Sequence, residues 1–257
     1  MRSPVAPVDV CGHSKQSRQS VASLSFGDSG GRFLFLMKPY NQDESVTIYN
    51  ADCRDVLPTL DTVDLVLTDP PYGIDGGNGG GNKARGKGLY EPTGWEDTPD
   101  YIRTIVIPVI EICIERFERV VLTPGQNHLR DYPQWQTIGA FWSGAATSFS
   151  SWGRNVWSPI LYYGKDPRAG LSQVPNGKTM NELPEKNGHP CPKPLIPWTW
   201  LLNKSMLEGE TVLDPFMGSG TTLRAAKDLN RKAIGIEIEE RYCEIAAKRM
   251  SQMVMEL

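Results

Sequence analysis

The tetrapeptide Asp69-Pro70-Pro71-Tyr72 stands directly after an apolar run at residues 63–68. Prolines cannot donate to a β ladder, so the run is predicted to be a buried strand with Asp69 at its carboxyl end. The turn presents a carboxylate, backbone carbonyl oxygens and an aromatic ring. Acceptors that converge on one point suit an amino group, and a ring beside them suits a flipped, planar base. The plainer alternative is a turn that only terminates the strand.

A glycine-containing turn forms the second candidate site. Asp214 follows a short apolar segment, and Gly218 and Gly220 lie just before a predicted helix. Glycines at such a turn let the backbone approach a ligand closely. No lysine follows Gly220, which excludes a GxxxxGK[ST] phosphate loop, and Leu223 stands where a GxGxxG dinucleotide motif needs glycine. Because GxG turns are common, the ligand has to be inferred from the acidic residues nearby.

Two carboxylates narrow the choice of ligand. Asp214 lies at the turn, and Glu237 ends the next predicted strand about 20 residues later, where an acidic residue commonly binds ribose hydroxyls. A carboxylate at the first position suits a cationic ligand better than a phosphate. S-adenosylmethionine fits both positions, since it carries a ribose, an ammonium and a sulfonium. The alternative is that Glu237 belongs to a solvated helix start together with Glu239 and Glu240.

Alternating strand and helix patterns surround these two sites. Strands are predicted at residues 46–49, 63–68, 120–123, 211–213 and 232–236, a hairpin at 138–142 and 156–163, and helices at 53–60, 99–118, 195–206, 221–229 and 239–253. Pro108 should kink or split the second helix. This alternation predicts an α/β doubly wound sheet, which binds ligands outside the carboxyl ends of its strands. Both candidate sites lie at such ends.

The composition excludes several classes of protein. The chain has 257 residues, a formal net charge of −3, 39% hydrophobic and 22% charged residues, so most of it should fold and it is not a histone-like basic protein. The cysteines form no CxxC pair, and we expect neither a disulfide framework nor a metal site. No apolar run resembles a membrane span or a signal peptide, so we expect a cytoplasmic protein without a membrane partner.

The chain is predicted to divide into a tail and one catalytic domain. Residues 1–44 are rich in Ser, Gly, Gln and Pro and should form a flexible tail, and residues 45–257 should form the domain. A polar stretch at residues 164–188, which contains Gly and Pro, is predicted to be a loop. Basic residues on the glycine-rich loop at 73–88 could wrap DNA phosphates, namely Lys83, Arg85 and Lys87. The alternative is that this loop is a solvated linker.

Together, these motifs resemble those of the amino-methylating DNA methyltransferases, which act on the N6 of adenine or the N4 of cytosine. The catalytic motif precedes the cofactor motif, as in the circularly permuted beta group of that family. Three further stretches agree with the resemblance: Asn50-Ala51-Asp52, His189-Pro190 with Lys193-Pro194, and Gly235-Ile236-Glu237. The resemblance covers roughly residues 45–257, and it implies that the stretch at residues 164–188 is a short target-recognition insert. It departs at Cys191 and Pro192, where the family often has Thr and Gln or Glu.

The resemblance implies a fold and a set of site residues. The fold is a doubly wound, mostly parallel sheet of seven strands, circularly permuted, with an antiparallel hairpin at one edge. The catalytic group is Asp69, Pro70, Pro71 and Tyr72. The residues implied for S-adenosylmethionine are Asp52, Asp214, Phe216, Gly218, Ser219, Gly220, Thr221, Glu237, His189 and Lys193. The cofactor adenine would meet Asp52, and the segment with His189 and Lys193 would close the pocket.

The resemblance also implies an activity. The expected enzyme is a site-specific methyltransferase that flips adenine out of double-stranded DNA and methylates its N6 by direct in-line transfer. Asp69 before Pro-Pro-Tyr favours adenine, since Ser at that position is more usual in cytosine-N4 enzymes. Cytosine-N4 methylation, an RNA or protein-amide methyltransferase, and an inactive nucleic-acid-binding relative are the alternatives. A homodimer is possible, and restriction–modification systems are a typical setting for the family.

Overall fold

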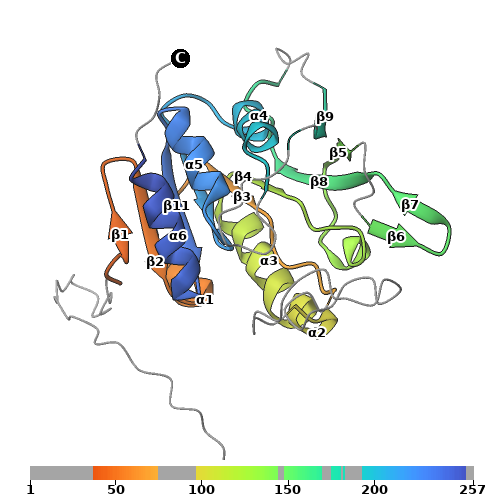
Figure 1. Ribbon diagram of the computed structural model, residues 1–257, viewed down its shortest axis with the longest axis horizontal. Coiled ribbons are helices and arrows are strands. Elements are labelled where there is room, and N and C mark those ends of the chain that lie inside the picture. Colours follow the sequence, from red (N-terminus) through yellow and green to blue (C-terminus); the bar gives the residue numbers. More distant parts are fainter. Residues whose placement is uncertain are drawn as a thin grey trace, which may run out of the picture. The chain divides into compact units, whose positions relative to one another are not determined.

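The computed structural model describes residues 37–74, 97–143, 148–169, 175–180, 182 and 193–252. Within these ranges, the segment Pro39–Leu257 belongs to one compact unit (Figure 1). The predicted tail lies almost wholly outside the described residues, and its boundary stays a prediction. No helix in the described ranges is long and apolar enough to cross a membrane.

A mixed sheet forms the centre of this unit. Its nine described strands are, in spatial order, β1 (Asn41–Gln42), β2 (Val46–Asn50), β11 (Lys232–Glu237), β10 (Thr211–Asp214), β3 (Leu65–Thr68), β4 (Arg119–Leu122), β8 (Trp157–Gly164), β5 (Thr137–Ser143) and β9 (Gly177–Met180). Strands β2, β11, β10, β3 and β4 run parallel to one another. Strand β8 is antiparallel to both of its neighbours, β4 and β5. The predicted doubly wound, mostly parallel fold is therefore confirmed.

The strand count differs from the prediction at the two edges. Seven strands were expected, and β1 and β9 add one at each side. Strand β1 has only two residues, too few for a periodic pattern. Strand β9 lies inside the polar stretch predicted as a loop, and it pairs with β5, so the predicted hairpin of β5 and β8 is one strand away from the edge.

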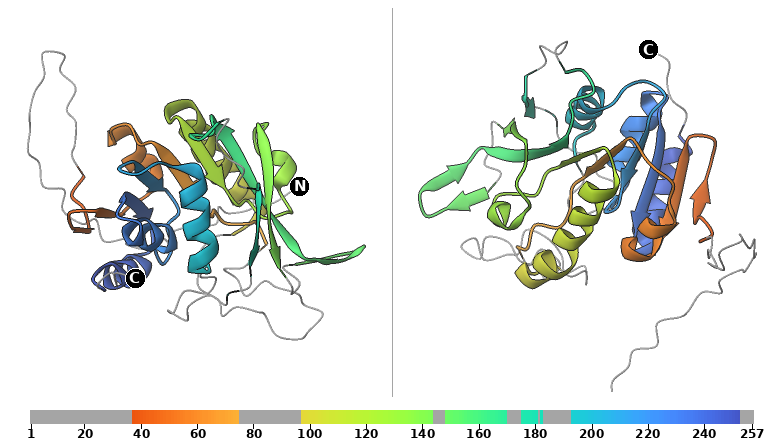
Figure 2. Two further views of the ribbon diagram at one scale, coloured as in Figure 1. Left: turned by 90° about the horizontal axis from the view of Figure 1, so that it is seen from above. Right: turned by 180° about the vertical axis from the view of Figure 1, so that it is seen from behind.

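Helices cover both faces of the sheet (Figure 2). Helices α4 (Leu195–Ser205), α5 (Thr221–Asp228) and α6 (Glu240–Met250) pack on one face, where their apolar residues join alternate residues of the strands in a single core cluster. The other helical segments are α1 (Cys53–Val56), η1 (Leu57–Thr59), α2 (Pro99–Tyr101), η4 (Ile102–Val106), α3 (Ile107–Arg116) and η5 (Leu129–Asp131). The hairpin of β6 (Ser148–Ser150) and β7 (Gly153–Asn155) forms a separate two-stranded sheet.

The predicted interruption at Pro108 takes the form of a π-helical turn. The helix begins at Pro99, where the Thr98 hydroxyl accepts a hydrogen bond from the Tyr101 amide (3.1 Å). Segment η4 is π-helical, and regular α-helix resumes with Pro108 in the first turn of α3. Proline has no amide to donate at this position, so a change of helical pitch just before it leaves fewer groups unpaired.

Candidate active site

The parallel strands bring the predicted site residues to one edge of the sheet. Asp214 is the last residue of β10 and Glu237 the last of β11. Asp69 directly follows β3, which pairs in parallel with β10. Asp52 follows β2, whose terminal Asn50 is in register with Glu237. Both sequence motifs therefore meet at the carboxyl edge, as expected for a doubly wound sheet.

Two hydroxyl groups anchor one oxygen of the Asp69 carboxylate. Asp69 Oδ1 accepts hydrogen bonds from the Tyr72 hydroxyl (2.6 Å) and from the Thr123 hydroxyl. Burial and the nearby carboxylate raise the pKa of Tyr72, so its hydroxyl stays protonated and donates. Thr123 was missed by the sequence reasoning. It follows β4, the strand next to β3, and only the pairing of these strands brings it to Asp69.

The other carboxylate oxygen of Asp69 binds Lys193. The Lys193 ammonium lies 2.6 Å from Asp69 Oδ2 and donates to the Tyr72 hydroxyl at 3.0 Å. Burial alone would lower the pKa of Lys193, but Asp69 and Tyr72 raise it overall, so the ammonium is charged. The resemblance implies a cofactor contact for this lysine, and in the structure its ammonium contacts Asp69 and Tyr72.

A buried carboxylate holds the backbone directly after Tyr72 in place. The Gly73 amide donates to the buried Asp97 carboxylate at 2.6 Å. Gly73 has φ +67°, and a Cβ there would come within 2.7 Å of His128 Nε2, so only glycine fits. His128 in turn contacts Asp131 (2.9 Å). Asp97 is a second residue that sequence reasoning missed, because the partner lies 24 residues away from Gly73.

Asp214 organises the glycine turn from inside the protein. Its buried carboxylate accepts hydrogen bonds from the Thr68 hydroxyl (2.7 Å), the Thr222 hydroxyl (2.6 Å) and the Phe216 amide (3.1 Å). Burial raises the pKa of Asp214 to about 6. Because both oxygens are used within the protein, Asp214 shapes the loop, and Thr68 links it to the strand that carries Asp69.

The remainder of the glycine turn is held by its neighbours. Gly218 and Gly220 have φ +50° and +77°, and Gly220 precedes the first residue of α5. Ser219 and Thr221 are buried. Arg249 from α6 donates to the Ser219 carbonyl (2.8 Å) and contacts the Thr221 hydroxyl (3.4 Å), a long-range role with no local sequence signal. The turn is thus built mainly of backbone.

Glu237 closes the turn from the next strand. Its Oε2 accepts a hydrogen bond from the Gly218 amide (3.0 Å), and its Oε1 accepts one from the Glu239 amide (2.8 Å). Burial raises the pKa of Glu237 to about 7. The carboxylate therefore belongs to the site, and the alternative of a fully solvated helix start does not hold.

A small pocket lies beside Glu237. It is lined by Ala51, Asp52, Cys53, Tyr101, Ile105, Pro215, Phe216, Glu237 and Ile238. Apolar and aromatic side chains suit a purine, and the two carboxylates suit hydroxyl and amino donors. Asp52 caps α1 through the Arg54 amide (2.9 Å) and pairs with the Arg54 guanidinium (2.5 Å). These residue types suit the adenosine part of S-adenosylmethionine.

The Cys53 thiol, which lines this pocket, is not expected to act as a nucleophile. Cys53 is buried, and burial raises the pKa of its thiol to about 12, so it stays protonated and unreactive. Across the described ranges, no group of three His, Cys, Asp or Glu side chains could hold a metal ion. Lys83, Arg85, Lys87, His189 and Cys191 lie outside the described residues.

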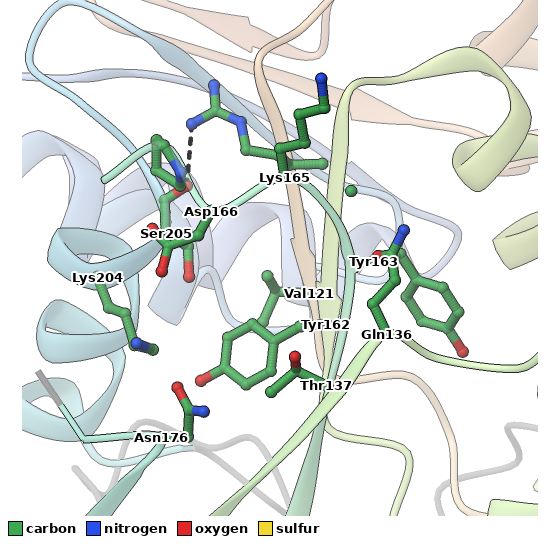
Figure 3. Close-up of a pocket in the computed structure, with 13 residues that line it drawn as sticks. Val121, Gln136, Thr137, Tyr162, Tyr163, Lys165, Asp166, Asn176, Lys204 and Ser205 are labelled. Carbon is green, nitrogen blue, oxygen red and sulfur yellow. Dashed lines mark hydrogen bonds between the residues drawn. The ribbon is translucent and has the colours of Figure 1, made fainter. Parts of the chain in front are cut away.

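A larger cavity, of about 130 Å³, lies away from these residues (Figure 3). It lies at the amino end of β4, and the Tyr162, Lys204 and Asn176 side chains are among those that line it. None of the predicted site residues borders this cavity. Choosing the larger cavity would therefore put the active site in the wrong place, because the predicted site residues lie at the opposite edge of the sheet.

Cofactor affinity is expected to rise with pH because of Glu237. With a pKa of about 7, this carboxyl group is mostly protonated at pH 6 and mostly ionised at pH 8. The ionised form accepts hydroxyl hydrogen bonds and attracts a cation, so the affinity should rise up to about tenfold over this range. Isothermal titration calorimetry with S-adenosylmethionine at several pH values measures it. The Glu237→Gln variant should bind more weakly with a flatter profile, and an unchanged profile would refute this role.

Similarity to known proteins agrees with this arrangement. Residues 125–248 match the N6_N4_Mtase family model, described as a DNA methylase. The Type II methyltransferase M2.LlaDCHI of Lactococcus lactis subsp. cremoris is 26% identical over 265 residues, which cover 85% of this chain and 94% of that protein.

Solved structures share the fold. The M1.HpyAVI–SAM complex has a TM-score of 0.58 at 20% identity and covers 80% of this chain and 100% of that one. The PvuII DNA methyltransferase, cytosine-N4-specific, has a TM-score of 0.60 at 14% identity and covers 85% of this chain and 91% of that one. Both similarities extend over most of the chain.

Proposed function

We propose that this chain, a DNA methyltransferase of the N6/N4 class, methylates the N6 amino group of adenine in double-stranded DNA. One observation carries the proposal. The Asp69–Tyr72 turn and the Asp214 turn lie side by side, joined by the hydrogen bond between Thr68 and Asp214 (2.7 Å). An acceptor group for an amine and a loop for a methyl donor are thus held within one rigid edge of the sheet.

Each part of the cofactor has a matching group. S-adenosylmethionine, when bound, supplies a methyl group on a positively charged sulfur. The pocket beside Phe216 would hold its adenine and Glu237 its ribose hydroxyls. The backbone of the turn between Asp214 and Thr221 would hold its methionine part. Asp214 shapes this turn and does not need to touch the ligand, because its oxygens are already bonded.

The catalytic turn makes a poor nucleophile reactive. The lone pair of an amine on a base ring is delocalised into the ring. Hydrogen bonds donated by this amine to Asp69 and to the Pro71 carbonyl would concentrate the lone pair on nitrogen, and the Tyr72 ring would stack on the base. The proton that the amine gives up passes to Asp69 or to water. Much of the acceleration comes from holding both substrates in line.

Cytosine-N4 methylation is the second candidate. Asp69 at the first position of the tetrapeptide favours adenine, since Ser is more usual there in the cytosine-N4 enzymes. The similarity in fold to the cytosine-N4-specific PvuII enzyme favours the alternative. Both reactions would use the same groups, because each target is an exocyclic amine on a planar ring.

Nucleoside mass spectrometry separates the two candidates. Purified protein is incubated with S-adenosylmethionine and unmethylated DNA, and the DNA is digested to nucleosides. We expect N6-methyl-2′-deoxyadenosine and no N4-methyl-2′-deoxycytidine. N4-methyl-2′-deoxycytidine alone would establish the alternative, and no methylated base on any DNA would refute both.

The β6–β7 hairpin is a candidate DNA contact. It connects the carboxyl end of β5 to the start of β8, so it extends from the edge that carries Asp69. Trp152, between its strands, is 98% exposed. A large exposed ring suits contact with bases, whose stacking on aromatic side chains is worth about 1–3 kcal/mol. The basic loop at 73–88 remains a further prediction.

Trp152→Ala should weaken DNA binding without affecting the cofactor. We expect the KM for DNA to rise about tenfold, since one stacking contact is lost. Methylation rates across a range of DNA concentrations give this value. Leu207→Ala is the matched control, because Leu207 is also exposed but lies just before β10, at the opposite edge. Equal KM values for the two variants would count against a DNA contact at the hairpin.

A further inference from the structure

We propose that Lys193 occupies the binding position of the target amine in the ligand-free protein and is displaced when the base enters. This inference rests on the proposed function, because it identifies what fills the catalytic acceptor before substrate arrives. Lys193 contacts both Asp69 Oδ2 (2.6 Å) and the Tyr72 hydroxyl (3.0 Å). Its ammonium also lies 4.8 Å from the centre of the Tyr72 ring.

The bonding of Asp69 leaves one oxygen for an incoming amine. Oδ1 already accepts hydrogen bonds from Tyr72 and Thr123. Oδ2 is the oxygen that Lys193 holds. A primary ammonium and an exocyclic amine are both nitrogen donors of similar size, so they compete for the same acceptor.

Lys193 also contacts Tyr72, the second feature of the tetrapeptide. Its ammonium binds the Tyr72 hydroxyl (3.0 Å) and lies 4.8 Å from the ring centre, so it sits at the hydroxyl edge of the ring. Lys193 thus holds the carboxylate and borders the ring on which the base would stack.

Lys193 has a way to leave. Its side chain and that of Asp69 keep 23% and 20% of their surfaces exposed, so neither is sealed in the interior. The residue lies two positions before α4, and its long stem can swing the ammonium into solvent without moving the helix. A placeholder of this kind keeps a half-buried carboxylate paired until an amine replaces it.

The first experiment tests the pairing without any DNA. Melting temperatures are measured for Asp69→Asn, Lys193→Met and the double variant. Each single change should lower the melting temperature by roughly 5 °C, because it leaves one charged partner unpaired, and the double variant should lose less than the sum. Additive losses would overturn the proposal. If Lys193→Met does not fold, Lys193→Gln takes its place.

The second experiment tests the competition. Kd values are measured for duplexes that carry the methylation site with adenine or with purine, which lacks the amino group, at the target position. In the wild type the amine must displace Lys193, so the two duplexes should bind within about threefold. In Lys193→Met the amine meets an unpaired carboxylate, and the preference for adenine should rise to about tenfold or more. Lys193→Arg, which keeps the cation, should behave like the wild type.

The outcomes separate this proposal from the proposed function. A preference for adenine that stays constant or falls in Lys193→Met would overturn the placeholder role, because the lysine would then assist the amine. If the enzyme methylates cytosine, the same comparison is made with cytosine and 2-pyrimidinone, and the same change in preference is expected. If no DNA is methylated, the proposed function fails, and the melting temperatures alone decide whether Lys193 and Asp69 form a coupled pair.

Discussion

Asp69→Ala is expected to reduce methyl transfer by about a thousandfold or more while S-adenosylmethionine binds with nearly unchanged affinity. The variant removes the acceptor for the target amine, and such positioned groups contribute about 10²–10⁴ in rate. Cofactor binding should survive, since Asp69 bonds only Tyr72, Thr123 and Lys193 among the described residues. Single-turnover methylation and calorimetric binding of the cofactor measure the two effects separately.

Asp64→Ala is the matched control for this variant. Asp64 immediately precedes β3 at the end opposite to Asp69, and it accepts a hydrogen bond from the Thr211 amide (2.7 Å). Its loss should lower stability slightly and leave the transfer rate within about twofold of the wild type. Loss of cofactor binding in Asp69→Ala, or a transfer rate close to that of the wild type, would contradict the division of roles between the two turns.

Asp214→Ala is expected to weaken S-adenosylmethionine binding by about a hundredfold and to lower the melting temperature by roughly 5–10 °C. The variant leaves the Thr68 and Thr222 hydroxyls and the Phe216 amide without their acceptor. Each buried donor left unpaired costs about 1–3 kcal/mol, and the turn loses its anchor. Calorimetry of cofactor binding and thermal unfolding check the two effects.

The conservative variant Asp214→Asn should fall between these results. Its amide oxygen can accept one or two of the hydrogen bonds, so the turn should be partly retained. Cofactor binding equal to that of the wild type in Asp214→Ala would show that the turn does not depend on Asp214. Thr222 is not expected to replace the lost acceptor, because its hydroxyl oxygen already accepts a hydrogen bond from Trp198 (3.0 Å).

Local motifs made the central features predictable. The Asp69 turn and the glycine turn each follow an apolar strand directly, and a parallel sheet brings all such ends to one edge. The buried strand β3 is apolar throughout apart from Thr68, as a strand covered on both faces should be. The fold class and the relative placement of Asp69, Asp214 and Glu237 therefore followed from strand ends alone.

The partners of these residues depend on pairings that a single sequence does not reveal. Thr123 reaches Asp69 across 54 positions, and Arg249 reaches Ser219 across 30. Lys193 belongs to a motif that the resemblance assigns to the cofactor pocket, yet it contacts Asp69, which lies 124 positions earlier in the sequence. Strand β9 was missed because Met180 is its only apolar side chain, so its four residues show no alternating pattern.

Methylation-aware sequencing of DNA from cells that express this protein tests the central claim most directly. The host should lack adenine methylation of its own, and the Asp69→Ala variant should be expressed beside the wild type at equal levels. The account predicts N6-methyladenine at a defined sequence with the wild type and none with the variant. Unmethylated adenine in both samples, or equal methylation in both, would contradict it.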